Sequence, residues 1–229
     1  MLAPSNTAFR QDFVEFQRLI ARCGIYNSLA QLAIKICAPG VPDFYQGSEL
    51  WDFTLVDPDN RRPVDYEKRR RLLTALDLEC VRDGRGDVAA RVLEAGDDRL
   101  KLFATSMLLR ARKQAQDIFS GGDYNPVNVQ GPQRDHVFAF TRRAGSRRLV
   151  VAVPRLVATL TSHGQEAPTG ERVWQDTHLL PPPGGWGDGF HPGFHDAMTD
   201  RCVTIQPGSG ALLMADVFDR FPVAVLLGS

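Results

Sequence analysis

Aromatic rings and forked polar groups are concentrated in residues 39–65, which read PGVPDFYQGSELWDFTLVDPDNRRPVD. A sugar presents apolar C–H faces, which flat rings can cover, and hydroxyl groups, which carboxylates, amides and guanidinium groups bind through paired hydrogen bonds. This stretch therefore has the side chains of a sugar-binding surface. The rings are Phe44, Tyr45, Trp51 and Phe53, and the forked groups are Gln46, Glu49, Asp57, Asn60, Arg61 and Arg62.

The same composition also suits a purely structural loop. In that alternative the rings fill a core and the arginines neutralise Asp57 or Asp59. Two of the carboxylates could also be named as the acid and nucleophile of a glycosidase, but such a pair must lie about 5 Å apart to act with retention. Spacing along the chain does not establish that distance, so no catalytic pair is assigned.

Composition narrows the classes of partner. The 229 residues carry 27 Lys+Arg and 27 Asp+Glu, a balance that gives no reason to expect nucleic acid or an anionic membrane surface. The longest apolar runs are far shorter than the roughly 20 residues of a membrane-spanning helix. The first residues, MLAPSNTAFRQDF, have no basic stretch followed by an apolar one, so we expect no secretion signal and a cytoplasmic protein.

No motif indicates a cofactor or a metal ion. The four cysteines form no CxxC pair, which favours reduced thiols over a zinc site or a disulfide framework. His191 and His195 are four residues apart, but HPGFH contains Pro and Gly, and a surface loop is the better interpretation. Neither GxGxxG nor a Walker pattern occurs, so we expect no nucleotide cofactor.

The first half of the chain reads as helical. Phe9, Phe13, Phe16 and Ile20 form one apolar stripe, and Gly24 suggests a helix end before a second helix with Leu29, Leu32, Ala33 and Ile36. VPDFYQG, residues 41–47, reads as a short buried strand. Further helices are expected over 64–81 and 98–119. The basic run 68–71 is interpreted as a solvated helix face.

From residue 124 the pattern changes to short β-rich runs separated by Gly and Pro. These runs include HVFAFTRR, RRLVVAVPRL, ERVWQDTHLLP and RCVTIQPG. Several short strands at such spacing predict a small antiparallel sandwich. We therefore predict an α+β chain with a domain boundary near Gly121, giving domains 1–120 and 121–229.

The loop also resembles a known family. PGVPDFYQGSE is similar to the segment at the eighth barrel strand of the α-amylase superfamily, with the pattern Pro-Gly-x-Pro-x-x-Tyr-x-Gly-x-Glu. The extension LWDFTLVDPDNRRPVDY, with NSLAQLAIKICAPG before it and IFSGGDYNPVNVQG after it, resembles the maltooligosyl trehalose synthase family. The resemblance covers nearly the whole chain and departs from the family pattern at 114–117 and 191–200.

The resemblance implies a fold and a reaction. The family has a (β/α)₈ barrel followed by a C-terminal β-sandwich, and it converts the reducing-end α-1,4 bond of a maltooligosaccharide into an α,α-1,1 bond. An aspartate attacks the anomeric carbon and a glutamate protonates the leaving oxygen. Those carboxylates follow earlier barrel strands, so we expect them upstream of this chain and assign no catalytic residue. A whole barrel needs roughly 250 residues, whereas fewer than 60 residues precede the block DPDNRRP in this chain.

The chain is accordingly expected to be the last barrel units plus the sandwich, inactive alone. The loop would form one wall of the sugar cleft, with Tyr45, Gln46 and Glu49 nearest the chemistry and Asp57, Asn60, Arg61 and Arg62 further out. Two alternatives stay open: a free-standing carbohydrate-binding module, and a fragment of another glucanotransferase or hydrolase. An incomplete barrel should expose the apolar stripes of residues 9–36 and 100–111 and could self-associate through them.

Overall fold

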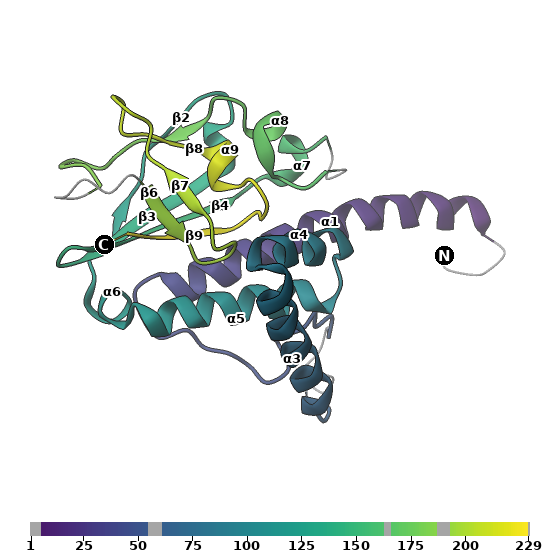
Figure 1. Cartoon of the computed structure of the whole chain (residues 1–229). Coiled ribbons are helices and arrows are strands. Elements are labelled where there is room, and N and C mark those ends of the chain that lie inside the picture. Colours follow the sequence, from purple (N-terminus) through teal and green to yellow (C-terminus); the bar gives the residue numbers. More distant parts are fainter. Residues whose placement is uncertain (1–5, 55–60, 163–165, 187–192, 229) are drawn as a thin grey trace.

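The structure is a computed structural model that describes residues 6–54, 61–162, 166–186 and 193–228. Helices occupy the first half of the chain, and antiparallel sheets with a few short helices occupy the second (Figure 1). The α+β prediction is therefore confirmed at this level. In the described part of the chain, no helix is long and apolar enough to cross a membrane.

The first helix, α1 (Thr7–Cys37), is continuous through the position where an end was predicted. It begins at Asn6, whose side-chain oxygen accepts a hydrogen bond from Phe9 N at 3.3 Å. The predicted end at Gly24 is wrong, because Gly24 keeps a negative φ and the helix passes through it. One glycine costs a helix only about 1 kcal/mol, and the core contacts of Leu29 to Cys37 exceed that.

Three further helices are joined by tight glycine turns. The predicted helix over 64–81 is α3 (Tyr66–Asp83), which ends at Gly84 with φ +89°. Then come α4 (Arg85–Ala95), ending at the left-handed Gly96, and α5 (Asp98–Gln114). A short α6 (Gln116–Gly121) follows a break at Ala115, so the helix predicted over 98–119 is two helices.

A six-stranded sheet has the order β1-β3-β4-β9-β6-β7. Its centre is the hairpin of β3 (Val137–Ala144) and β4 (Arg147–Pro154), whose turn contains Gly145 at φ +58°. β4 pairs on its other side with β9 (Ala224–Gly228). The outer strands are β1 (Asn125–Pro126), β6 (Gly193–Asp196) and β7 (Cys202–Thr204).

A second sheet of three short strands lies on the side of the first sheet away from helices α1 to α6. It has the order β2-β5-β8, from β2 (Val129–Gln130), β5 (His178–Leu179) and β8 (Leu212–Leu213). Three short helices accompany it: α7 (Val157–Leu160), α8 (Gly170–Trp174) and α9 (Met214–Val217). Of the predicted β-rich run ERVWQDTHLLP, His178–Leu179 is strand β5, but the first four residues, ERVW, lie in α8 and their prediction is wrong.

Both faces of the six-stranded sheet are buried, which explains the unbroken apolar run LVVAVP in β4. Leu149, Val151 and Val153 belong to one core with the helices. Val150 and Ala152 face a second core with the small sheet. The helices thus rest on one face of the sheet and share its core (Figure 1).

Residues 41–47 are not a strand, contrary to the prediction. They run as irregular chain into a turn at 46–49, and Val41 is 93% exposed. The described strands all lie between residues 125 and 228, so the backbone of 41–47 has no neighbouring strand with which to form a ladder. A short apolar and aromatic run cannot make a strand without that partner.

Candidate functional site

The candidate loop leaves the end of α1 at a point held by two arginines. Arg112 of α5 donates to Ile36 O at 2.6 Å and to Gly40 O at 2.8 Å. Arg142 of β3 donates to Cys37 O at 3.3 Å. The last carbonyls of a helix lack partners within the helix and attract cations, so these arginines fix the direction in which the loop departs.

Tyr45 and Gln46 lie at the start of a tight turn and expose their side chains to solvent. Gly47 in this turn has φ +87°, and its carbonyl accepts a hydrogen bond from Arg69 Nη2 at 2.7 Å. Nε of the same arginine lies 3.3 Å from Glu49 Oε1. Arg69 of α3 therefore holds the turn by a backbone carbonyl and by a carboxylate at once.

Trp51 anchors the next part of the loop to the start of α5. Its indole Nε1 donates to Asp97 O at 2.8 Å, and its backbone N donates to Asp98 Oδ1 at 3.3 Å. Lys101 donates to Leu50 O at 3.3 Å, and its Nζ lies 5.5 Å from the Trp51 ring centroid. The loop is thus tied to three helices, α1, α3 and α5.

Charges around the loop are shaped by burial and by local hydrogen bonds. Burial lowers the pKa of Lys101, and the neighbouring Lys35 lowers it further. The backbone N–H of Thr54 donates to Asp52 and lowers the pKa of that carboxyl, so Asp52 stays ionised and can accept hydrogen bonds from hydroxyl groups. Nζ of Lys35 lies 3.9 Å from the Phe44 ring centroid, a cation–π contact that positions the ring.

Of the predicted binding residues, the structure brings Tyr45, Gln46 and Glu49 together in the one turn. Arg61 and Arg62 are exposed, just before α3. Asp57 and Asn60 lie outside the described residues.

Five cations that hold the loop were missed from sequence: Lys35, Arg69, Lys101, Arg112 and Arg142. The solvated-face interpretation of residues 68–71 is wrong for Arg69, whose side chain is only 17% exposed. It suits Arg70, which is 73% exposed and pairs with Glu67 at 2.8 Å. A helix of Arg and Lys gives no sequence signal for which of them turns toward a loop 20 residues away.

Among the described residues, no cluster of three or more His, Cys, Asp or Glu side chains could hold a metal ion. His195 lies in β6 and has Nε2 2.9 Å from Asp200 Oδ1. His191 lies outside the described residues. All four cysteines are free thiols, and burial raises the pKa of Cys37 to about 12.

The curated proteins whose sequences match this chain are maltooligosyl trehalose synthases. The chain matches no established protein-family profile. It is 40% identical over 216 residues to a putative maltooligosyl trehalose synthase of Mycobacterium tuberculosis, a match that covers 93% of this chain and 22% of that protein.

Solved structures agree. A maltooligosyltrehalose synthase from Arthrobacter ramosus superposes with a TM-score of 0.62 and 31% identity, over 90% of this chain and 22% of that one. A noncanonic maltogenic α-amylase from Thermotoga neapolitana, 12% identical over 89% of this chain and 36% of its own, shares the fold alone with a TM-score of 0.54. The chain is therefore homologous, over nearly its whole length, to a segment that makes up about a fifth of maltooligosyl trehalose synthases.

Proposed function

We propose that the chain is the C-terminal part of a maltooligosyl trehalose synthase and acts in trehalose biosynthesis in the cytoplasm. The reaction would convert the reducing-end α-1,4 bond of a maltooligosaccharide into an α,α-1,1 bond. The observation that carries the proposal is the 40% identity across 93% of the chain. Because the chain spans only 22% of that relative, the remaining machinery would come from a longer polypeptide.

The proposal includes two structural units. Residues 1–120 would complete an α-amylase-type barrel, and residues 121–229 would form its β-sandwich. Support comes from the run of helices whose last member, α6, ends at Gly121, and from two antiparallel sheets that enclose a common core after it. The loop of residues 39–65 would then lie at the carboxyl-end face of the barrel, where sites of this fold form.

In this proposal the loop binds sugar and carries out no bond breaking itself. The exposed Tyr45 ring would cover a C–H face of a glucose unit, and Gln46 would bind its hydroxyl groups. Arg69 holds Glu49 at 3.3 Å, which would fix that carboxylate as a hydrogen-bond acceptor. A fixed wall would also help to retain the released glucose and to exclude water while it turns.

A chimera tests the proposal. The matching segment of the Mycobacterium tuberculosis relative would be replaced by this chain and the product incubated with maltopentaose. We expect reducing ends to disappear without release of free glucose, because the new bond joins two anomeric carbons. Tyr45→Ala in the chimera should lower kcat/KM about tenfold, which corresponds to about 1.4 kcal/mol of lost sugar contact.

The matched control is Tyr66→Ala, since Tyr66 is 55% exposed and Tyr45 is 52% exposed. Tyr66 begins α3 outside the turn, so its loss should leave kcat/KM unchanged. A chimera that unfolds cooperatively but converts no substrate would contradict the proposal. Conversion of maltopentaose by the isolated chain would show that the rest of the enzyme is not required.

A further inference from the structure

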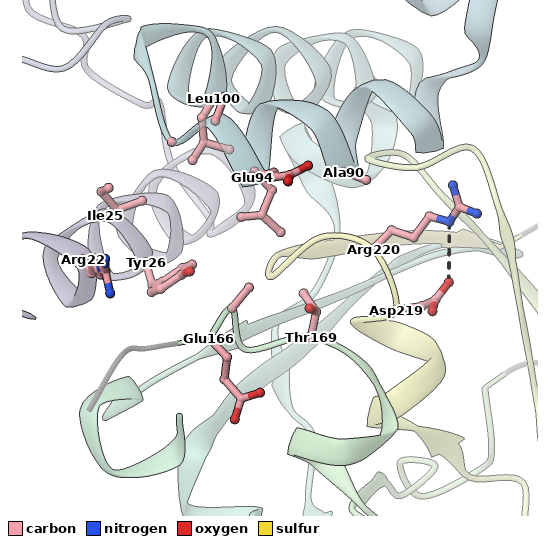
Figure 2. Close-up of a pocket in the computed structure, with 14 residues that line it drawn as sticks. Arg22, Ile25, Tyr26, Ala90, Glu94, Leu100, Glu166, Thr169, Asp219 and Arg220 are labelled. Carbon is pink, nitrogen blue, oxygen red and sulfur yellow. Dashed lines mark ion pairs between the residues drawn. The ribbon is translucent and has the colours of Figure 1, made fainter. Parts of the chain in front are cut away.

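A cavity of about 690 Å³ lies where the helical half meets the sheet half, and the candidate loop does not line it. Its walls come from α1, α4, the turn at Gly96, residues 166–169 and the pair Asp219–Arg220 (Figure 2). This volume is within the roughly 300–1,000 Å³ of small-molecule sites. The cavity is therefore large enough for one or two sugar units.

Most of the charges in this cavity already have protein partners. Arg220 pairs with Asp87 and lies 3.9 Å from Asp219. Asp219 also pairs with Arg201, and Glu166, on the opposite wall, pairs with Arg172. A ligand that carried its own net charge would have to compete with these ion pairs, so the cavity favours a neutral molecule.

Two charged groups remain without an opposite charge in the part of the chain that the structure describes. They are Arg22 of α1 and Glu94 of α4, and both side chains are exposed at the cavity. Guanidinium and carboxylate groups each form paired hydrogen bonds, which match the neighbouring hydroxyl groups of a sugar ring.

An aromatic ring and apolar side chains complete the lining. Tyr26 is half-buried in the wall formed by α1, and burial raises the pKa of its hydroxyl group. Figure 2 shows Tyr26 and Glu94 on two different helices that border the same space. Ile25, Leu93 and Leu100 supply apolar surface. The lining thus offers a flat ring for C–H faces and two forks for hydroxyl groups.

We propose that this cavity is a second binding site, for a short neutral α-1,4-glucan. The choice of an α-1,4-linked chain rests on the proposed function, whereas the choice of a neutral polyhydroxylated ligand rests on the cavity itself. Phosphorylated ligands fit poorly, because the three carboxylates that line the cavity, of Glu94, Glu166 and Asp219, outnumber its two arginines, Arg22 and Arg220. The site would hold a glucan chain away from the loop of residues 39–65.

The test uses the whole chain, labelled with ¹⁵N, and maltopentaose as the probe. We expect dose-dependent shifts of the backbone amide signals of Gly96 and Thr169, which line the cavity. Tyr26→Ala and Glu94→Gln should each weaken this binding at least tenfold. Glu94 is exposed, so its substitution is not expected to disturb folding, and Tyr26→Phe keeps the ring and should retain most of the affinity.

Two control variants separate this site from the loop. Tyr66→Ala and Tyr45→Ala should leave the shifts of Gly96 and Thr169 unchanged, because neither residue lines the cavity. Cellopentaose, with the same units in β-1,4 linkage, should bind more weakly than maltopentaose. The proposal is overturned if maltopentaose shifts neither signal, if Glu94→Gln binds as well as the natural chain, or if inorganic phosphate binds in its place. None of these results would affect the activity expected of the chimera.

Discussion

At the scale of single residues, Gly47 is a position of the candidate loop where the backbone conformation and the neighbouring atoms strongly restrict the residue type. Its φ of +87° is a conformation that L side chains rarely adopt. A Cβ atom there would lie 3.3 Å from both Arg69 Nη2 and Val64 Cγ2. The turn that presents Tyr45 and Gln46 therefore needs a residue without a side chain.

We predict that Gly47→Ala lowers the free energy of unfolding by about 1–2 kcal/mol, because it combines a strained φ with a displaced Arg69. Urea unfolding would measure the loss. Gly24→Ala is the control, since Gly24 lies in α1 with nothing within 4 Å of the added Cβ. That change should raise stability by up to about 1 kcal/mol. Equal effects of the two substitutions would contradict the strain argument.

The sequence displays the side-chain chemistry of the loop, but the contacts that hold the loop could not be predicted from it. The aromatic rings and the carboxylate, amide and guanidinium groups of residues 39–65 can be read directly from the sequence. In the structure, Tyr45, Gln46 and Glu49 do share one turn. Arg69 holds that turn and Lys101 holds the next part of the loop, and both stand in helices whose sequence pattern is ordinary. Their roles depend on how α3 and α5 are rotated against the loop, and tertiary packing decides this.

At the scale of elements, one buried arginine joins α1, α6 and β3. Arg142 is 1% exposed, and its guanidinium donates to the carbonyls of Asp123, Cys37, Phe119 and Gly122 at 2.9–3.3 Å. These carbonyls come from the ends of two helices and from the chain that enters the sheet. The cation thus links the helical half to the sheet at the point where the loop departs.

We predict that Arg142→Met lowers the free energy of unfolding by about 3 kcal/mol, because several buried carbonyls lose a charged donor. The matched control is Arg143→Met, the next residue on the same strand, whose side chain is exposed. That substitution should stay within about 0.5 kcal/mol of the natural chain. Thermal and urea unfolding would both report the difference, and a similar loss in the two variants would refute the linking role.

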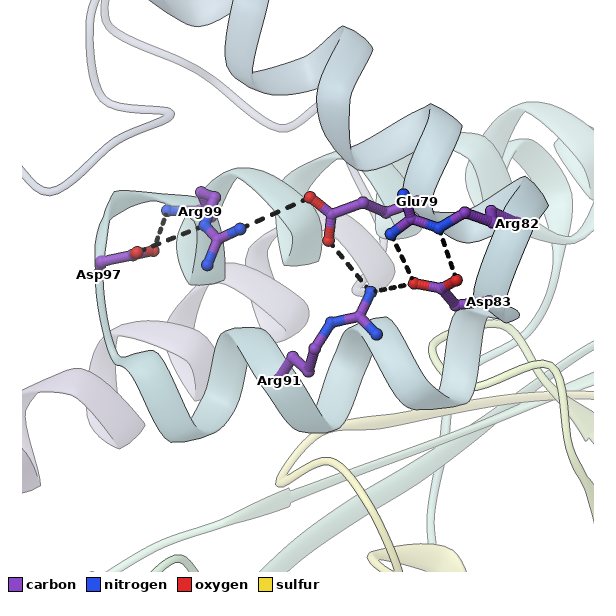
Figure 3. A network of polar contacts seen from close by, with 6 residues as sticks. All are labelled: Glu79, Arg82, Asp83, Arg91, Asp97 and Arg99. Carbon is purple, nitrogen blue, oxygen red and sulfur yellow. Dashed lines mark hydrogen bonds and ion pairs between the residues drawn. The ribbon is translucent and has the colours of Figure 1, made fainter.

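Ion pairs connect α3, α4 and α5 on the surface (Figure 3). Arg91 of α4 donates to Glu79 at 3.1 Å and to Asp83 at 2.7 Å, both in α3. Arg99 of α5 lies 3.6 Å from Glu79. The hydrogen bonds from Arg82, and then those from Arg91, hold the pKa of Asp83 well below its usual value.

A lowered carboxyl pKa gives stability that is present above the pKa of the unfolded chain, about 4, and is lost as the pH falls further. We therefore predict that the melting temperature falls more steeply below pH 4 in the natural chain than in Asp83→Asn. Asp12→Asn, on the exposed part of α1, should leave the slope unchanged. Added salt should weaken the effect, because the network is on the surface. If the melting temperature fell with equal steepness below pH 4 in all three proteins, Asp83 would not contribute to the loss of stability in acid.

Helices were predicted better than their ends. The stripe of Leu100, Phe103, Met107 and Leu108 is buried as an amphipathic pattern implies. Gly24 shows where prediction of helix ends fails: a glycine that locally favours a helix end does not end the helix when the turns after it are packed in a core. Residues 41–47 show the opposite limit, since a strand needs hydrogen-bonding neighbours that a local pattern does not contain.

At the scale of the whole molecule, the predicted exposure of apolar stripes holds for only one segment. Leu29 to Ile36 and the stripe of α5 are buried in the core that the helices share with the sheet, so their predicted exposure is wrong. Phe13, Phe16 and Ile20 are 47%, 63% and 54% exposed on the first half of α1. Figure 1 shows this half of the helix extending away from the other elements.

Large apolar side chains in a row on a helix are unfavourable in water and are usually covered by a partner. Phe9 and Phe13 stack at 5.9 Å, which makes the stripe continuous at its start. In the proposed longer enzyme, other parts of the barrel would cover it. In the isolated chain, the most accessible apolar partner is the same stripe on a second copy, and two such helices could pair along their apolar sides.

We therefore predict that the isolated chain self-associates through α1, and that light scattering gives a mass that rises with protein concentration. The double variant Phe16→Glu and Ile20→Glu should be monomeric, because like charges and lost apolar burial both oppose pairing. The control Leu78→Glu and Val81→Glu alters two apolar residues of α3 that are 66% and 88% exposed, and should leave association intact. A natural chain that is monomeric at all concentrations, or association that survives the first double variant, would mean that the stripe on α1 does not drive pairing.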